Sequence, residues 1–166
     1  MAGTLFLVAT PIGNWEDITL RALQVLKEVD LVVYEERKEG SRLLRHYGIE
    51  KQVESLNEHN EAAATQVILE RIWGGISVAL ISDAGTPVFS DPGQGLVQRA
   101  IQIGIRIVPI PGASSLTAAL IVSGFPIRNF LFQGFLSPKR DRRIAELQQL
   151  KREARTVVLM DAPYRL

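Results

Sequence analysis

Residues 78–93 read VALISDAGTPVFSDPG, in which an apolar run passes directly into turn-forming and small polar residues. The run Ile76–Ile81 predicts a strand buried on both faces, since it lacks the alternation of a half-exposed strand. The residues after it predict a tight loop, and Asp91-Pro92-Gly93 predicts the start of the next helix. Strands of this kind belong to parallel sheets, whose helices cover both faces.

The same pattern recurs along most of the chain. Apolar runs predict strands at Leu5–Ala9, Leu31–Tyr34 and Ile105–Ile110, with a weaker one at Gln52–Leu56. Helical spacing predicts the helices Thr19–Glu28, Ser41–Tyr47, Glu61–Trp73 and Gly95–Ile103 between them. Strands that alternate with helices imply right-handed crossovers, so we expect an α/β fold with a parallel, doubly wound sheet.

The pattern changes after residue 112. A helix at Ser114–Ser123, a strand at Asn129–Leu136, a basic helix and a strand at Thr156–Met160 are expected there. We therefore divide the chain into an N-terminal α/β domain at 1–112 and the start of a C-terminal α/β domain at 113–166. Two strands and two helices in about 55 residues bury little surface, so we expect the second domain either to pack on the first or to be incomplete.

The composition excludes several kinds of protein and site. The 166 residues are 46% hydrophobic and 22% charged, which is typical of a globular protein rather than a disordered one. The absence of cysteine excludes disulfides, thiolate metal sites and a cysteine nucleophile, and it fits a cytoplasmic location. No apolar run reaches the roughly 18–20 residues of a membrane-spanning helix. No spacing of His, Asp and Glu predicts a catalytic metal.

The net charge of +1 is unevenly distributed. Residues 1–136 carry 11 Lys and Arg against 14 Asp and Glu, whereas residues 137–155 carry 7 against 3. A basic run of this kind is often only the solvated face of a helix. The alternative is a binding surface for a polyanion such as RNA.

Three loops of glycine, proline and small residues follow predicted strands: ATPIGNWEDIT at 9–19, SDAGTPVFSDPG at 82–93 and PGASS at 111–115. Any one of them could be an ordinary turn, and Asp17 with Thr19 could simply cap a helix. The carboxyl ends of parallel strands meet at one sheet edge, however, and ligands bind there. Because the P-loop and GxGxxG patterns are absent, the loops predict a pocket of another kind.

Four segments carry a resemblance to a known family: LFLVATPIGNWEDITLRAL at 5–23, VALISDAGTPVFSDPG at 78–93, VPIPGASSLTAAL at 108–120 and FLFQGFLSPK at 130–139. In order and in register they resemble the tetrapyrrole methylase superfamily, and within it the branch that methylates small-subunit ribosomal RNA. The resemblance implies two α/β domains with S-adenosylmethionine in the cleft between them, and methylation of a cytidine ribose 2′-hydroxyl. It also implies a homodimer, and a second domain that continues well beyond DAPYRL.

The resemblance implies cofactor-binding residues from all three loops and the last strand: Pro11, Ile12, Asp83, Ala84, Gly85, Thr86, Ser114, Ser115 and Met160. Asp83 and the loop backbone beside it would meet the methionine and ribose portions, and Met160 would lie near the adenine. Such a zwitterionic cofactor requires a carboxylate or hydroxyl for its amine and ribose, and backbone donors for its carboxylate.

The second predicted strand ends in EERKEG at 35–40, where the family usually has Glu-Asp-Thr-Arg. We expect this stretch to be a loop on the substrate side of the cleft. A hydroxyl acceptor must lose its proton, so a nearby base would assist the reaction. The candidate catalytic residues are Glu35, Glu36 and His59, with Glu58 next to His59 in the polar stretch NEHNE. The simpler interpretation of NEHNE is a surface loop before the next helix.

Two groups of basic residues are candidates for RNA binding: Arg37, Lys38 and Arg42 with Arg45, and Lys139, Arg140, Arg142 and Arg143. Contacts from such residues to phosphates position a nucleic acid without specifying its sequence. Phe130, Phe132 and Phe135 could stack on bases, although their alternation on a strand favours core packing.

Three functions stay open at this point. The resemblance favours a ribose methyltransferase that acts on the RNA of the small ribosomal subunit. A second hypothesis keeps the cofactor and changes the acceptor to a tetrapyrrole or another small molecule, which would not need the basic segment 137–155. A third is a non-catalytic module that binds cofactor or RNA without turnover.

Overall fold

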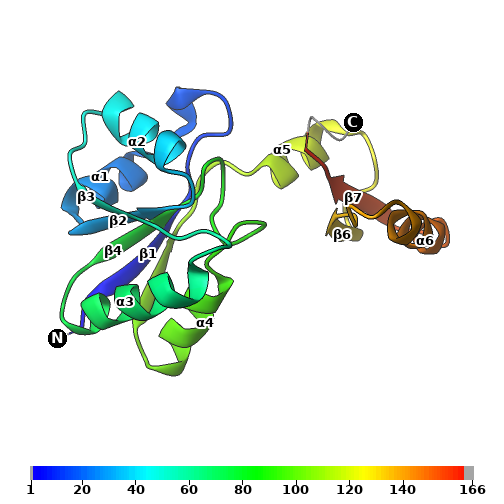
Figure 1. The fold of residues 1–166 in the computed structure, drawn as a ribbon. Coiled ribbons are helices and arrows are strands. Elements are labelled where there is room, and N and C mark those ends of the chain that lie inside the picture. The colour runs from blue at the N-terminus through cyan, green and yellow to red at the C-terminus, as the bar shows by residue number, and fades with distance from the viewer. Residues whose placement is uncertain (1, 163–166) are drawn as a thin grey trace. The chain divides into compact units, whose positions relative to one another are not determined.

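The computed structural model of the protein describes residues 2–162 and contains two compact units, residues 1–114 and residues 115–166 (Figure 1). The division falls after Ser114, at the start of a helix.

The first unit is built on a five-stranded sheet in the order β3-β2-β4-β1-β5, and every pair of neighbours is parallel. The strands are β1 (Thr4–Val8), β2 (Leu31–Tyr34), β3 (Gln52–Ser55), β4 (Val78–Ile81) and β5 (Arg106–Ile110). The helices between them are α1 (Leu20–Glu28), α2 (Arg37–His46), α3 (Glu61–Trp73) and α4 (Gln94–Gln102), with a short 3₁₀ turn at Trp15–Asp17. The predicted parallel α/β architecture is confirmed.

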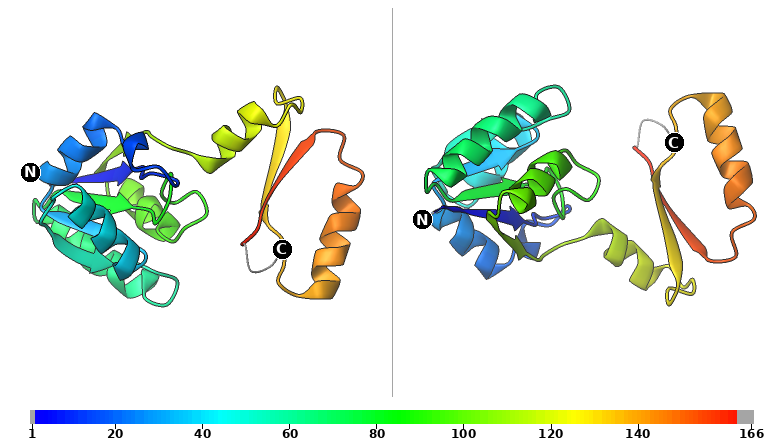
Figure 2. Two further views of the ribbon diagram at one scale, coloured as in Figure 1. Left: turned by 90° about the horizontal axis from the view of Figure 1, so that it is seen from above. Right: turned by 90° about the horizontal axis from the view of Figure 1, so that it is seen from below.

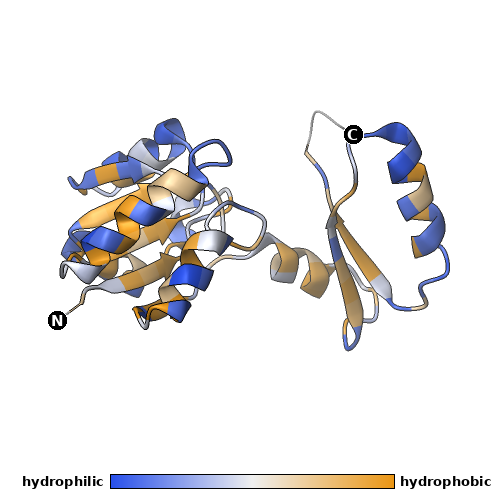
Figure 3. Cartoon of the chain, turned by 60° about the horizontal axis from the view of Figure 1, so that its bottom comes forward, coloured by the Kyte–Doolittle hydropathy of each residue, from blue (hydrophilic) through white to orange (hydrophobic). Residues whose placement is uncertain are grey.

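Helices cover both faces of this sheet (Figure 1). One buried cluster joins α1 and α2 to the sheet, with members such as Leu26, Leu43 and Ala79. A second joins α3 and α4 to the opposite face, with members such as Ile68 and Leu96. Strands β2 and β4 are buried along their whole length, which is why their sequences are continuously apolar. Figure 3 shows the apolar strands between helices with polar outer faces.

Helix α2 begins four residues before the predicted start, at Arg37 rather than Ser41. The prediction of a loop at EERKEG is therefore wrong from Arg37 onward. Glycine usually weakens a helix. In the structure Gly40 is buried, and a Cβ there would overlap the ring of Tyr34. The absent side chain lets the first turns of α2 lie directly on the end of β2.

The second unit contains α5 (Ser115–Val122), β6 (Phe130–Phe135), α6 (Arg140–Leu150) and β7 (Thr156–Met160). Strands β6 and β7 pair in parallel, and α6 connects them and runs alongside (Figure 2). The register shifts between Phe132 and Gly134, where Gly134 has a φ of 73°. This bulge interrupts the alternation of the three phenylalanines. Phe130 and Phe132 are half-buried, whereas Phe135 is 48% exposed.

Candidate functional site

The loops after β1 and β4 are joined by backbone hydrogen bonds. The N–H of Thr10 donates to the carbonyl of Gly85 at 2.9 Å, and the N–H of Gly85 donates to the carbonyl of Thr10 at 3.1 Å. The hydroxyl of Thr10 donates to the carbonyl of Ser82 at 3.0 Å, and Thr10 is only 1% exposed. This pairing extends the sheet order into two loops that the sequence predicted as neighbours.

The PGASS loop joins the same layer. The hydroxyl of Thr86 donates to the carbonyl of Ala113 at 3.3 Å. Gly112 lies so close to β1 that a Cβ on it would come within 3.0 Å of the Cβ of Ala9. The three loops therefore meet at the carboxyl end of the sheet, within the first unit.

Gly85 is required where the three loops meet. Its φ of +90° favours glycine, and an added Cβ would lie 3.2 Å from Cγ2 of Ile12 and 3.6 Å from the carbonyl oxygen of Ala113. Both of its backbone polar groups already bond to Thr10. The role of Gly85 is therefore to let the loops approach each other closely, rather than to offer backbone hydrogen-bonding groups to a ligand.

The second half of the β4 loop is fixed by α3. Gly93 is the N-cap residue of α4, and its φ is 116°. The carboxylate of Glu61 accepts hydrogen bonds from the N–H groups of Gly93 at 3.0 Å and Gly95 at 3.2 Å. Val88 also has a positive φ of 70°, which is strained for a β-branched residue. The predicted helix start at Asp91-Pro92-Gly93 is thus present, and sequence reasoning missed Glu61 as its cap.

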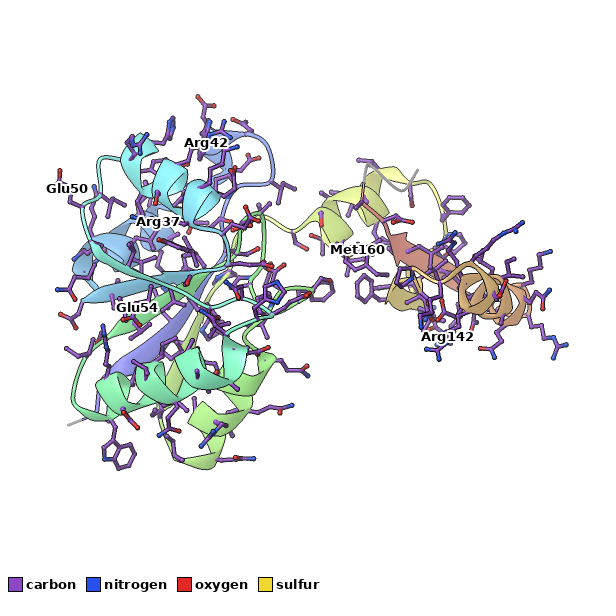
Figure 4. The ribbon with its side chains drawn as sticks, viewed as in Figure 1. Arg37, Arg42, Glu50, Glu54, Arg142 and Met160 are labelled. Atoms are coloured by element: carbon purple, nitrogen blue, oxygen red, sulfur yellow. The ribbon has the colours of Figure 1, made fainter. Side chains whose placement is uncertain are left out.

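A cavity of about 300 Å³ lies between the first two loops and α2. Its lining residues come from all three segments: Pro11, Ile12, Gly13, Trp15, Glu39, Arg42, Leu43, Asp83 and Ala84. Four of the residues predicted to bind the cofactor therefore line a cavity with Arg42, which was predicted to bind RNA. Figure 4 shows Arg42 on α2, beside the loop that follows β1.

An aromatic stack supports one wall of this cavity. The ring of Trp15 stacks on His46 at a centroid distance of 4.3 Å, and the guanidinium carbon of Arg42 lies 5.3 Å from the centroid of Trp15. The hydroxyl of Tyr47 donates to the carbonyl of Trp15 at 2.5 Å. Sequence reasoning missed Trp15. The only available signal was the i, i+4 spacing of Arg42 and His46, which puts both on one helix face.

Carboxyl groups gather beside the cavity, where β2 and β4 end. The pKa of Glu35 is raised to about 7, chiefly by burial and then by the negative charges of Asp83, Asp91, Glu58 and Glu36. Burial also raises the pKa of Asp83, although the N–H of Glu36 donates to Asp83 Oδ1 at 3.3 Å and opposes that change. The carboxyl of Glu35 is therefore expected to exchange its proton with solvent near neutral pH.

The other two catalytic candidates, Glu36 and His59, have different surroundings from Glu35. Glu36 is the N-cap residue of α2 and holds Asp83 through its backbone. His59 is exposed in the loop before α3 and does not line the cavity. Its backbone N–H donates to Asn57 Oδ1 at 3.0 Å.

Each of the two basic groups includes residues at the start of a helix. Arg37 and Lys38 form the first turn of α2, and Arg42 lies one turn later. In the second unit, Lys139 is the N-cap residue of α6, followed by Arg140, Arg142 and Arg143. The guanidinium of Arg143 donates to the carbonyls of Ser137 and Pro138, each at 3.3 Å.

The remaining predicted cofactor residues are divided between the units. Ser114 ends the first unit, whereas Ser115 begins α5 and Met160 ends β7 in the second. Among the described residues, no three His, Asp or Glu side chains gather as metal ligands would. Residues 2–162 also contain no helix long and apolar enough to span a membrane.

The sequence profile of the tetrapyrrole (corrin/porphyrin) methylases matches residues 4–166. The chain belongs to this family. Among curated relatives, it is 50% identical over 165 residues to the ribosomal RNA small subunit methyltransferase I of Pseudomonas aeruginosa, covering 99% of this chain and 58% of the relative. It is 45% identical over 166 residues to the protein of that name from Pasteurella multocida, covering 100% of this chain and 59% of the relative. The chain thus spans less than two thirds of the length of these methylase-family relatives.

Two solved structures have a similar fold. A diphthine synthase superposes with a TM-score of 0.70 at 20% identity, over 96% of this chain and 65% of that one. The uroporphyrin III C-methyltransferase of Thermus thermophilus superposes with a TM-score of 0.63 at 20% identity, over 92% of this chain and 78% of that one. At these identities the likeness bears on the fold alone, and it agrees with the parallel sheet of the first unit.

Proposed function

We propose that the full-length protein is an S-adenosylmethionine-dependent methyltransferase that methylates the 2′-hydroxyl of a cytidine in small-subunit ribosomal RNA. The observation that carries the proposal is the meeting of three loops at one sheet edge, beside a carboxyl group whose pKa is about 7. The relatives named as ribosomal RNA small subunit methyltransferases support the choice of acceptor.

The residues at the loop junction fit this cofactor. S-adenosylmethionine supplies a methyl group on a positively charged sulfur. The half-buried carboxylate of Asp83 offers an acceptor for its amine or ribose, and Pro11 and Ile12 offer apolar walls. Because Gly85 has its own backbone groups paired with Thr10, its part is to leave room. Ala84, Thr86, Ser114, Ser115 and Met160 complete the proposed set.

Glu35 is the proposed base for the acceptor. As the oxygen–carbon bond forms and the sulfur–carbon bond breaks, the carboxylate of Glu35 takes the proton that the 2′-hydroxyl loses. A base with a pKa near the working pH is the most effective, and burial among other carboxyl groups gives Glu35 that value of about 7. Loops that hold the acceptor oxygen in line with the methyl group would supply most of the remaining rate enhancement.

The positions of the basic residues support a polyanionic substrate. Arg37 and Lys38 begin α2, and Arg140, Arg142 and Arg143 begin α6. Cations at a helix N-terminus are opposed by the helix dipole, so these groups cost stability where they stand. The same positions favour phosphate, because backbone N–H groups and basic side chains then point to one anion. We assign both groups to the RNA backbone.

The proposal is tested in two steps with the full-length protein. Calorimetry is expected to show binding of S-adenosylmethionine and of its demethylated product, and an absence of binding would remove the cofactor assignment. Incubation of small ribosomal subunits with cofactor labelled in its methyl group then identifies the acceptor. Label in the ribosomal RNA supports the proposal, whereas label that enters only a porphyrinoid would replace RNA by a small-molecule acceptor.

The family resemblance further predicts a homodimer in the cytoplasm. Sedimentation of the full-length protein tests the first of these, and a monomer at micromolar concentration would contradict it.

A further inference from the structure

The cavity beside Arg42 is lined by three charged side chains, those of Glu39, Arg42 and Asp83. Its volume of about 300 Å³ is at the small end of ligand pockets in proteins, about 300–1,000 Å³. Pro11, Ile12 and Asp83 connect it to the proposed cofactor loops, and its opposite wall is α2. A space of this size has room for one nucleobase against α2, and is too small for a tetrapyrrole macrocycle.

Arg42 is held in place before any ligand arrives. Its guanidinium lies over Trp15 at 5.3 Å, and Trp15 is itself fixed by the ring of His46 and by the hydroxyl of Tyr47. A cation over an aromatic face loses fewer conformations on binding than a solvated arginine. The side chain of Arg42 is still 63% exposed, so its N–H groups can reach a ligand.

Glu39 lies one helical turn before Arg42, and its carboxylate oxygen is 3.6 Å from Arg42 Nη1. Both residues line the cavity. The pair therefore presents hydrogen-bond acceptors next to hydrogen-bond donors along one wall. An ion pair this exposed contributes little to stability, which leaves both groups available for a ligand.

We propose that the α2 wall of this cavity binds the base of the acceptor nucleotide, beside the methyl donor at Pro11, Ile12 and Asp83, and that Glu39 and Arg42 select a pyrimidine with an amino group. Cytosine presents a 4-amino donor next to the acceptors N3 and O2, which complements a carboxylate next to a guanidinium. Uracil presents an oxygen at position 4, which would face the carboxylate of Glu39 as a second acceptor. The base would be turned out of its stack to enter the cavity, as in other enzymes that act on single nucleotides.

This inference rests on the proposed function, but binding of free nucleotides tests it separately. The chain has two tryptophans, so Trp73→Phe leaves Trp15 as the only fluorescent indole in the described part of the chain. Cytidine monophosphate is expected to quench Trp15 at concentrations where uridine monophosphate does not. Glu39→Gln should remove the preference, because an amide can donate to the uracil oxygen. Equal quenching by both nucleotides in the parent protein would overturn the inference, whether or not RNA is methylated.

A second arm uses catalysis by the full-length protein. Once the labelled nucleotide is mapped, small-subunit RNA with uridine at that position is expected to react about 10- to 100-fold more slowly than RNA with cytidine. Glu39→Gln should shrink that ratio, and Arg42→Lys should raise KM for RNA while the Kd for the cofactor is unchanged. An unaltered cytidine-to-uridine ratio in Glu39→Gln would refute the assignment, whereas methylation absent from every RNA refutes the proposed function instead.

Matched controls separate recognition from folding. Glu50→Gln changes an exposed carboxylate that follows α2 and does not line the cavity (Figure 4). Arg106→Lys changes an exposed arginine at the first residue of β5, and so at the opposite end of the sheet from the loops. Both variants are expected to keep the nucleotide preference and the rate of the parent protein.

Discussion

The two units differ in how completely they bury their apolar side chains. In the first, helices cover both faces of the sheet, and β2 and β4 are buried throughout. In the second, β6 pairs with β7, and Ile121, Val122 and Phe125 are 74%, 81% and 67% exposed. The difference means that the loop junction and the cavity rest on a complete core. The proposed roles of Ser115, Met160 and the basic start of α6 depend on a unit with little core of its own.

The largest expected effect is a difference in stability between matched leucines. Leu96 is fully buried in the first unit, and Leu96→Ala is expected to lower the free energy of unfolding by about 2–5 kcal/mol. Leu159 is 42% exposed in the second unit, and Leu159→Ala is expected to cost less than about 1 kcal/mol. Chemical denaturation of the 166-residue chain measures both. Equal losses would mean that the second unit has a core as complete as the first.

The next effect concerns the contribution of the first unit to the affinity for the cofactor. Asp83→Ala removes a half-buried carboxylate from the loop junction and is expected to weaken S-adenosylmethionine binding by about 1–3 kcal/mol. Calorimetry on the full-length protein measures the change, with the exposed Glu50→Ala as the matched control. An unchanged affinity in Asp83→Ala would remove this residue from the site.

A smaller effect concerns the pH dependence that Glu35 gives to the first unit. The pKa of its carboxyl rises from 4.5 to about 7 on folding, so the folded state binds this proton more tightly than the unfolded state. The protonated Glu35 carboxyl therefore contributes to the free energy of unfolding. This contribution is fully present below about pH 4.5 and is lost as the pH rises through about 7. Above pH 7, Glu35→Gln is expected to be more stable than the parent by about 1 kcal/mol, allowing for solvent screening at a half-exposed side chain.

The same variant tests catalysis. Methyl transfer by the full-length parent protein should rise with pH through about 7, as the Glu35 carboxylate forms. Glu35→Gln should be slow at every pH, because an amide accepts no proton. A parent rate profile that is flat between pH 6 and pH 8 would contradict the assignment of Glu35 as the base.

The smallest effects compare the basic helix starts of the two units. Arg37→Gln in α2 and Arg142→Gln in α6 are each expected to stabilise the protein by about 0.3–1 kcal/mol, because each removes a cation from the positive end of a helix. Each should also weaken RNA binding and reduce its salt dependence, by about 0.7–0.9 in the logarithmic slope. Filter binding at several salt concentrations measures this. If only Arg37→Gln changes the slope, RNA contacts the first unit alone.

Most of the first unit could be predicted from its sequence, because continuous apolar runs such as Leu31–Tyr34 report burial on both faces directly. The junction of the three loops was also predictable, since it follows from parallel strands that end at one edge. The start of α2 was not, because it depends on Gly40 lying against the ring of Tyr34. That contact is between elements, and no local preference encodes it.

The chemistry of the cavity was predictable only in part. Asp83 and Arg42 were identified as candidates, but as members of two separate sites. Their meeting depends on α2 lying beside the β1 loop. Trp15 of that loop contacts both Arg42 and His46 of the helix. The elevated pKa of Glu35 likewise depends first on its burial in the fold, and then on carboxylates such as Asp83 and Asp91 from distant parts of the chain. The spacing of residues along the sequence does not predict such contacts between distant segments.

The paired amides of Thr10 and Gly85 have a consequence for exchange with solvent. Both belong to loops, and loop amides usually exchange their hydrogens within seconds to minutes. The two N–H groups donate to each other's carbonyls. The hydroxyl of buried Thr10 also accepts a hydrogen bond from the N–H of Gly85 and donates to the carbonyl of Ser82. Their exchange should therefore require the opening of the sheet itself, and they should behave as members of the most slowly exchanging group in the first unit. The cofactor would then enter a rim already as rigid as the strands beneath it.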